Sequence, residues 1–204
     1  MAPMYSDEYK TVEAKVEAGI EDRGWSFQST LVPAVSVSAA QTALKAMQKT
    51  WAGDAVASHV IRIGLPAEAE VTMHSDEESV DAAKVLLNLL EDAELTHVLL
   101  LVVKMPLPDQ KSTSASERAY HDAGLNAIQR AKKVVRILYN TIEVIPGHEN
   151  IEFLGNFIQD LRAKVVQVTR GQQTTMTVKV RASQIDSFKK NLQSRYPKIE
   201  FQSS

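Results

Sequence analysis

Cysteine is absent from all 204 residues of the sequence. Disulfide bonds, zinc sites built on thiolates and cysteine nucleophiles are therefore excluded, whereas the redox compartment is left open. Long apolar runs are also missing. The longest, residues 98–103, has the length of a strand, while a membrane helix needs about 18 apolar residues or more. We therefore expect a protein without membrane contact.

A targeting signature is missing as well. The first ten residues contain no basic region followed by an apolar stretch, so we expect no secretory signal. Their acidic residues argue against an organelle transit peptide. We expect a cytoplasmic protein, with a mitochondrial location as the alternative.

Motifs of common enzymes are not found. The sequence has no HExxH, GxSxG, Walker A or GxGxxG pattern, and no two histidines have the i, i+4 spacing of a helical metal pair. His59 is interpreted as a structural or loop histidine. The run Asp76, Glu77 and Glu78 has two interpretations, namely acid–base or divalent-cation chemistry and a solvated acidic loop before a helix N-terminus. The second explains the run without chemistry, so we expect no enzyme activity, cofactor, metal or small-molecule substrate.

The composition is that of a globular protein, with 44% apolar and 24% charged residues. The formal net charge of −2 conceals an uneven distribution. Residues 161–204 hold nine lysines and arginines against Asp186 and Glu200, a net charge of +7, whereas residues 68–94 carry −8. Either the basic region binds a polyanionic partner, or the acidic and basic regions attract each other.

Hydrophobic periodicity predicts an α+β domain over residues 1–134. The apolar run at residues 98–103 predicts a central strand buried on both faces. The other predicted elements are a half-buried strand at 12–20, a strand from Trp25 to Pro33, strands at 59–64 and 70–73, and three helices. Capping boxes at Ser38/Gln41 and Ser114/Glu117 are expected to open two of these helices, and Ser79 is expected to open the third.

The remainder, residues 135–204, predicts a ferredoxin-like βαββαβ domain. A strand at 135–145 and a helix at 151–161 come first. Strands at 164–169 and 174–181 form a hairpin around Arg170-Gly171, because glycine adopts a positive φ at little cost. A helix capped by Ser183 and Asp186 and a closing strand at 198–202 complete the order.

Several short segments carry a resemblance to a known family. Residues 57–59 (Ala-Ser-His), residues 61–64 (Ile-Arg-Ile-Gly) and residues 118–120 (Arg-Ala-Tyr) match its elements, while residues 75–79 retain one Asp and the Glu of an Asp-Asp-Gly-Glu-Pro segment. The sequence resembles the IMPACT family, whose bacterial members are the YigZ-type proteins, over residues 20–202. The family has a glycine-rich loop, which in this sequence is replaced by Lys-Met-Pro-Leu-Pro at residues 104–108 and Ser-Thr-Ser-Ala at residues 112–115.

The resemblance implies an N-terminal ribosomal-protein-like βα domain and a C-terminal ferredoxin-like domain similar to one in elongation factor G. It also implies a role in translational control. The eukaryotic members carry an additional N-terminal domain for which this chain is too short. Loss of the glycines is expected to close a surface at which a backbone would approach a ligand or an anion.

The basic C-terminal domain predicts a binding surface for RNA or a ribonucleoprotein. Along residues 174–181, Met176, Val178 and Val180 are expected on one face of the strand. The opposite face and the hairpin tip supply groups suited to phosphate oxygens, namely Thr175, Thr177, Lys179, Arg181 and Arg170. A second basic cluster at the junction of the two domains is expected to extend this surface; its members are Arg130, Lys132, Lys133 and Arg136. No aromatic residue interleaves with the basic ones, so base stacking is not indicated. A protein–protein scaffold is the alternative function.

Overall fold

The computed structural model describes residues 7–51, 55–108, 116–147, 151–171 and 173–203. Two compact units make up the chain: residues 9–136 form one, and residues 137–204 with Asp7 and Glu8 form the other. The division falls within strands β1 (Glu8–Val12) and β7 (Lys133–Ile137), which pair in a two-stranded sheet. No helix in these ranges has the length and apolar character needed to cross a membrane.

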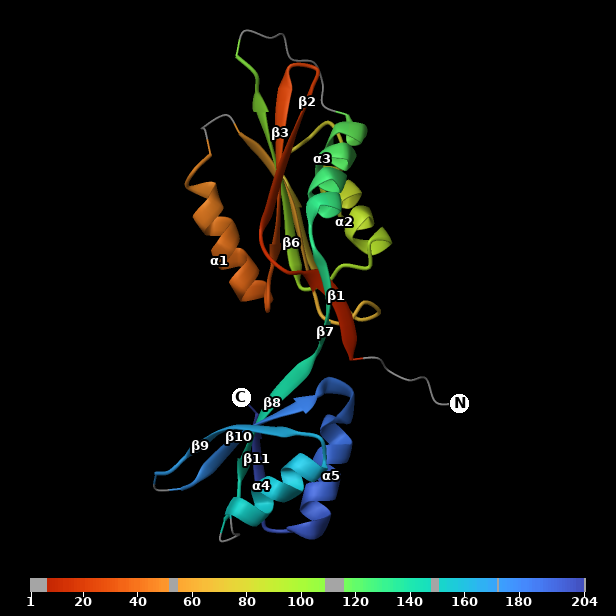
Figure 1. The fold of residues 1–204 in the computed structure, drawn as a ribbon. Helices are drawn as coiled ribbons and strands as arrows, with labels where there is room; N and C mark the ends of the chain where they lie inside the picture. Colours follow the sequence, from red (N-terminus) through yellow and green to blue (C-terminus); the bar gives the residue numbers. More distant parts are fainter. Residues whose placement is uncertain (1–6, 52–54, 109–115, 148–150, 172, 204) are drawn as a thin grey trace. The chain divides into compact units, whose positions relative to one another are not determined.

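An antiparallel five-stranded sheet is the centre of the unit formed by residues 9–136 (Figure 1). The central strand, β6, contains the apolar run at residues 98–103, in which no residue is more than 4% exposed. The predicted central strand is therefore confirmed. The strands, in their order across the sheet, are β2 (Val16–Asp22), β3 (Trp25–Pro33), β6 (Val98–Pro106), β4 (Val56–Ile63) and β5 (Glu70–Ser75).

Helices lie on both faces of this sheet. Helices α2 (Ala82–Asp92) and α3 (Glu117–Arg130) pack on one face, where they bury the larger apolar core. Helix α1 (Val37–Gln48) packs on the other face against β4 and β6 (Figure 1). Within the described part of this unit, two helices therefore cover one face, whereas a single helix lies on the other.

The helix starts differ from the predicted capping residues. The hydroxyl of Ser36 accepts a hydrogen bond from the amide of Ala39, so Ser36 rather than Ser38 caps α1. Asp81 caps α2, and Ser116 caps α3. Ser114 lies outside the described residues. In each case the capping residue directly precedes the first residue of the helix, and its side chain accepts a hydrogen bond from a free amide of the first turn.

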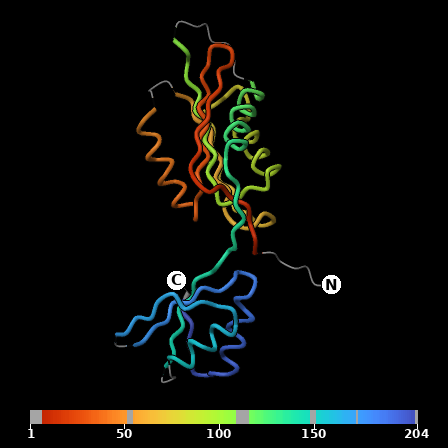
Figure 2. Tube along the Cα trace, in the orientation of Figure 1, coloured from red at the N-terminus to blue at the C-terminus, as the bar shows by residue number. Residues whose placement is uncertain are grey.

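The C-terminal unit has the predicted βαββαβ order, which confirms the α+β class and the ferredoxin-like arrangement. Figure 2 follows the chain from β8 to the C-terminus. The antiparallel sheet has the order β11-β8-β10-β9. The elements in chain order are β8 (Tyr139–Ile145), α4 (Ile151–Asp160), β9 (Lys164–Thr169), β10 (Thr175–Arg181), α5 (Ile185–Arg195) and β11 (Glu200–Ser203).

Three local expectations are wrong. The predicted strand at residues 12–20 is interrupted, because β1 ends at Val12 and β2 begins at Val16. The predicted strand at residues 135–145 is two strands, β7 and β8. The last helix has no side-chain cap: a 3-10 turn, η1 (Ala182–Gln184), precedes α5, and both the amide and the hydroxyl of Ser183 donate to the Asp7 carboxylate at 2.7 Å.

Candidate functional site

The predicted binding residues of β10 lie on one face of the C-terminal sheet. Met176, Val178 and Val180 are buried under α4 and α5. Since side chains of a strand alternate between faces, the remaining residues of β10 point to the opposite face. These residues are Thr175, Thr177, Lys179 and Arg181, and the two cations are exposed.

The register of the sheet adds neighbours to these cations. Lys179 pairs with Lys164 of β9 on one side and with Thr141 of β8 on the other. Arg181 pairs with Tyr139 of β8. Directly paired residues of an antiparallel sheet share a face, with Cβ atoms about 5 Å apart. Two adjacent rungs of the sheet therefore hold three cations and one tyrosine. We call these four residues the basic end of the sheet: Lys164, Lys179, Arg181 and Tyr139.

The rest of this face is close to neutral. Glu143 pairs with Thr177 on one side and with Gln202 on the other. The following rung pairs Thr175 with Thr169. Positive charge is therefore concentrated at the basic end. Within the described part of this unit, the two helices pack against the opposite face, so neither of them covers the basic end.

Tyr139 was not anticipated. No aromatic residue interleaves with the basic residues of β10, as the sequence shows, but the neighbouring strand β8 brings one beside them, because Tyr139 is 44% exposed and shares a face with Arg181. The sequence contains a signal for it. Ile142 and Val144 are buried, so the period of two along β8 places Tyr139 on the opposite face.

The other predicted basic residues are distributed over both units. Arg170 follows β9 in the C-terminal unit and is exposed. The second cluster belongs to the unit of residues 9–136, where Arg130 ends α3 and Lys133 begins β7. Lys132 forms a 3.0 Å ion pair with Glu13.

A buried polar cluster lies at the end of the five-stranded sheet, on the face covered by α2 and α3. Its centre is Glu77, in the loop after β5. Glu77 forms an ion pair with Lys104 of β6, and the two side chains are only 6% and 7% exposed. The hydroxyl of Tyr120 in α3 donates to the same carboxylate at 3.0 Å, and the amide of Ser79 donates at 3.1 Å. The Lys104 ammonium also lies 4.5 Å from the centroid of the Trp25 ring.

This arrangement keeps Glu77 ionised. Burial alone would raise the pKa of Glu77, but hydrogen bonds from Lys104, Ser79 and Tyr120 outweigh it and lower the pKa to about 2. Burial and then the negative charge of Glu77 raise the pKa of Tyr120 well above its ordinary value. The cluster therefore contains an ionised carboxylate and a neutral phenol, and neither of these two groups is poised to exchange a proton near neutral pH.

The expectation of a solvated acidic loop is wrong for Glu77, whose partners come from β6 and α3. Asp76 next to it is exposed and accepts a hydrogen bond from His74 at 2.8 Å. The rings of His74 and His59 lie 5.8 Å apart. Among the residues that the structure describes, no group of three or more histidine, aspartate or glutamate side chains is arranged to hold a metal ion. The substituted loop at residues 112–115 lies outside those residues.

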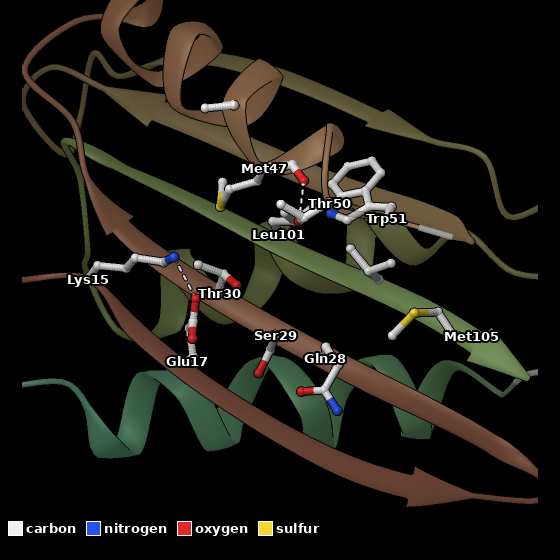
Figure 3. A pocket seen from close by; sticks show the side chains of 12 residues that line it. Lys15, Glu17, Gln28, Ser29, Thr30, Met47, Thr50, Trp51, Leu101 and Met105 are labelled. Carbon is white, nitrogen blue, oxygen red and sulfur yellow. Dashed lines mark hydrogen bonds and ion pairs between the residues drawn. The ribbon is translucent and has the colours of Figure 1, made fainter. Parts of the chain in front are cut away.

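A groove of about 510 Å³ lies beside α1, on the face of the five-stranded sheet that this helix covers only in part (Figure 3). Its apolar wall is formed by Met47, Trp51 and Met105, and the ion pair of Lys15 with Glu17 lies at its polar side. Soft, flexible methionine side chains adapt to different binding partners. This groove was not anticipated from the sequence.

Comparisons with known proteins inform the fold only. The sequence matches no family model and no curated protein sequence. A crystal structure of a hypothetical protein has a TM-score of 0.65 with 13% identity and covers 97% of both chains. The two-domain translational regulator Yih1 has a TM-score of 0.35 and 16% identity over 64% of this chain and 49% of its own. A protein from Thermus thermophilus has a TM-score of 0.44 and 9% identity over 97% of this chain and 28% of its own. The first of the three shares the two-unit fold, and the two lower scores carry no argument.

Proposed function

We propose that this protein is a non-catalytic RNA-binding protein that contacts the RNA backbone through the basic end of its C-terminal sheet. The observation that carries the proposal is the clustering of Lys164, Lys179 and Arg181 on two adjacent rungs of a face that α4 and α5 leave uncovered. Lysine and arginine are the principal ligands of phosphate oxygens in nucleic-acid complexes.

The state of the acidic loop supports a role without catalysis. A general acid or base works best with a pKa near the working pH, whereas the pKa of Glu77 is about 2 and its carboxylate is occupied by Lys104. Asp76 is engaged by His74. The resemblance of residues 57–64 and 118–120 to the IMPACT family supports placing the bound RNA in the translation machinery.

The test is a titration of the full chain against a labelled single-stranded RNA of about 12 nucleotides. In the variant Lys179→Ala/Arg181→Ala, we expect weaker binding and a slope of log K against log salt that is smaller by about 1.4, because two phosphate contacts are lost. The matched control is Lys190→Ala/Lys198→Ala, which removes two exposed cations of the same unit outside β10. If both variants lose the same amount of RNA affinity, the effect is one of net charge alone, and the proposed binding surface is wrong.

A second candidate function, binding of a partner protein, is favoured by the groove beside α1. A tryptophan beside two methionines is typical of protein-binding surfaces. Affinity capture from the protein's own cells at low salt and at about 0.3 M salt separates the two candidates. RNA that is recovered only at low salt supports the first. A protein that survives salt and nuclease, and that is lost in Trp51→Ser, supports the second.

A further inference from the structure

Tyr139 is an exposed aromatic side chain at the basic end. It is the first residue of β8 and is 44% exposed. Among the described residues, no side chain forms a hydrogen bond or a ring contact with its ring or hydroxyl. Burying such a ring contributes binding energy in proportion to the apolar area removed from water, so an exposed ring beside cations is a ready stacking surface.

The charges around Tyr139 fit the two parts of a nucleotide. Arg181 is its direct partner across the strands, at a Cβ separation of about 5 Å. Lys179 and Lys164 occupy the next rung on the same face, about 7 Å further along the strands. A flat ring with one cation beside it and two more on the next rung offers a surface for a base and positions for the phosphates that flank it.

We infer that the basic end binds single-stranded RNA, with one unpaired base stacked on Tyr139 and the flanking phosphates held by Arg181 and Lys179. The inference rests on the proposed function and specifies its ligand. In a duplex the bases are stacked on each other and their faces are inaccessible, whereas an unpaired base can stack on an aromatic side chain. Stacking is tolerant of sequence because every base has a π face.

A second feature of the site favours single-stranded RNA over duplex RNA. Glu143 lies on the same face, one rung beyond the rung of Lys179. Its carboxylate repels phosphates, so the cationic stretch is limited to about two rungs. A single extended strand fits that footprint, whereas a duplex would bring a second row of phosphates over the neutral part of the sheet.

The experiment measures the affinity of the full chain for a labelled single-stranded RNA of about 12 nucleotides and for the duplex of the same sequence. We expect Tyr139→Ala to weaken binding of the single strand by about 5- to 100-fold. The salt slope should be unchanged in this variant, because no ionic contact is removed. Tyr139→Phe should retain the affinity, since the ring is kept. Phe153→Ala is the matched control, because Phe153 is a 70% exposed aromatic residue of α4.

A 2-aminopurine base in the single strand reports stacking directly. Its fluorescence should be quenched on binding to the natural chain and to Tyr139→Phe, but not on binding to Tyr139→Ala. Circular dichroism melting of each variant verifies that the C-terminal unit is folded.

The possible failures are distinguishable. If Tyr139→Ala binds the single strand as tightly as the natural chain while Lys179→Ala/Arg181→Ala does not, the stacking inference is overturned and the proposed function stands. Equal affinities for duplex and single strand would also overturn the inference. If Lys179→Ala/Arg181→Ala retains full affinity for both RNAs, the proposed function itself fails.

Discussion

Glu77 and Lys104 form an ion pair in which both side chains are more than nine-tenths buried. The two residues are 27 positions apart, and Tyr120, which donates to the same carboxylate, is a further 16 positions along. The cluster therefore joins the loop after β5 to the central strand and to α3. Because a buried charge without a partner is very unfavourable, each member depends on the others.

Removal of Lys104 alone is expected to destabilise the unit of residues 9–136 strongly. In Lys104→Met the carboxylate of Glu77 is left buried without its cation, and the free energy of unfolding should fall by about 3–5 kcal/mol. The double variant Lys104→Met/Glu77→Gln should recover part of this loss, because both charges are removed. Urea unfolding followed by circular dichroism measures the difference.

The exposed ion pair of Lys10 with Glu94 provides the control for that experiment. Its side chains are 48% and 65% exposed, so water screens the interaction and Lys10→Met should leave the unfolding midpoint almost unchanged. Comparable losses in Lys10→Met and Lys104→Met would show that burial of the Glu77 pair contributes nothing.

The pKa of Glu77 leads to a prediction about acid stability. Its pKa is about 2 in the folded chain and 4.5 in its ordinary state, so the folded state resists protonation. The contribution is complete above pH 4.5, is on the order of 3 kcal/mol, and is lost as the pH falls from about 4.5 toward 2. The natural chain should therefore exceed Glu77→Gln in free energy of unfolding at pH 7, with a difference that shrinks below pH 4.5. A difference that is constant from pH 7 to pH 3 would contradict this assignment.

The sequence predicted best what depends on local pattern. The uninterrupted apolar run at residues 98–103 is sufficient to identify the central strand, and the alternation along residues 174–181 is sufficient to identify the polar face of β10. The order of elements in the C-terminal unit follows from the same periodicities. Gly171 does lie between β9 and β10, but the expectation that it adopts a positive φ there is wrong, because its φ is outside the left-handed region.

What the sequence did not predict depends on contacts between distant residues. Glu77 has the pattern of a solvated loop, and its burial results from partners in β6 and α3. Tyr139 joins Arg181 only through the register of β8 with β10. Asp7, at the other end of the chain, binds Ser183 across 176 positions. No local periodicity encodes such pairings, because they are fixed when the sheets and cores assemble.

His97 is buried in an unusual state. It has a positive φ of 55° and is 6% exposed, and its ring lies 4.1 Å from the ring of Tyr9. Neither ring nitrogen has a hydrogen-bond partner among the described residues. Burial lowers the pKa of His97, although the nearby backbone of Ala34 opposes it. The neutral ring is therefore the form that the folded chain accommodates.

The burial of a neutral His97 ring predicts that the folded chain loses stability in mild acid. Above pH 6.5 the ring is neutral in both the folded and the unfolded chain. As the pH falls below 6.5, the unfolded chain takes up a proton that the folded chain resists, so the free energy of unfolding decreases. His97→Asn should remove this part of the pH dependence, since asparagine does not titrate and tolerates a positive φ. Unfolding of both proteins in urea between pH 8 and pH 5, a range of about 1.5 units on either side of that value, measures it. Identical pH slopes would show that His97 does not contribute.

Two helical glycines are expected to respond in opposite ways to alanine. A Cβ at Gly124 in α3 would lie 2.8 Å from Leu89 and 3.0 Å from Leu86, whereas a Cβ at Gly155 in α4 meets nothing within 4 Å. Both leucines are buried in the core between α2 and α3, so they have little room to move aside. Alanine raises helix propensity by about 1 kcal/mol at either position, and overpacking costs about 1–3 kcal/mol.

Gly155→Ala should therefore stabilise the C-terminal unit by up to about 1 kcal/mol, while Gly124→Ala should destabilise the other unit by about 1 kcal/mol. Chemical unfolding gives the sign of each change, and hydrogen exchange of amides in α3 and α4 assigns it to a unit. Because the two substitutions are chemically identical, their difference isolates the close approach of α2 to α3. If Gly124→Ala were as stabilising as Gly155→Ala, Leu86 and Leu89 would have to repack without cost, and the glycine would not be required for that approach.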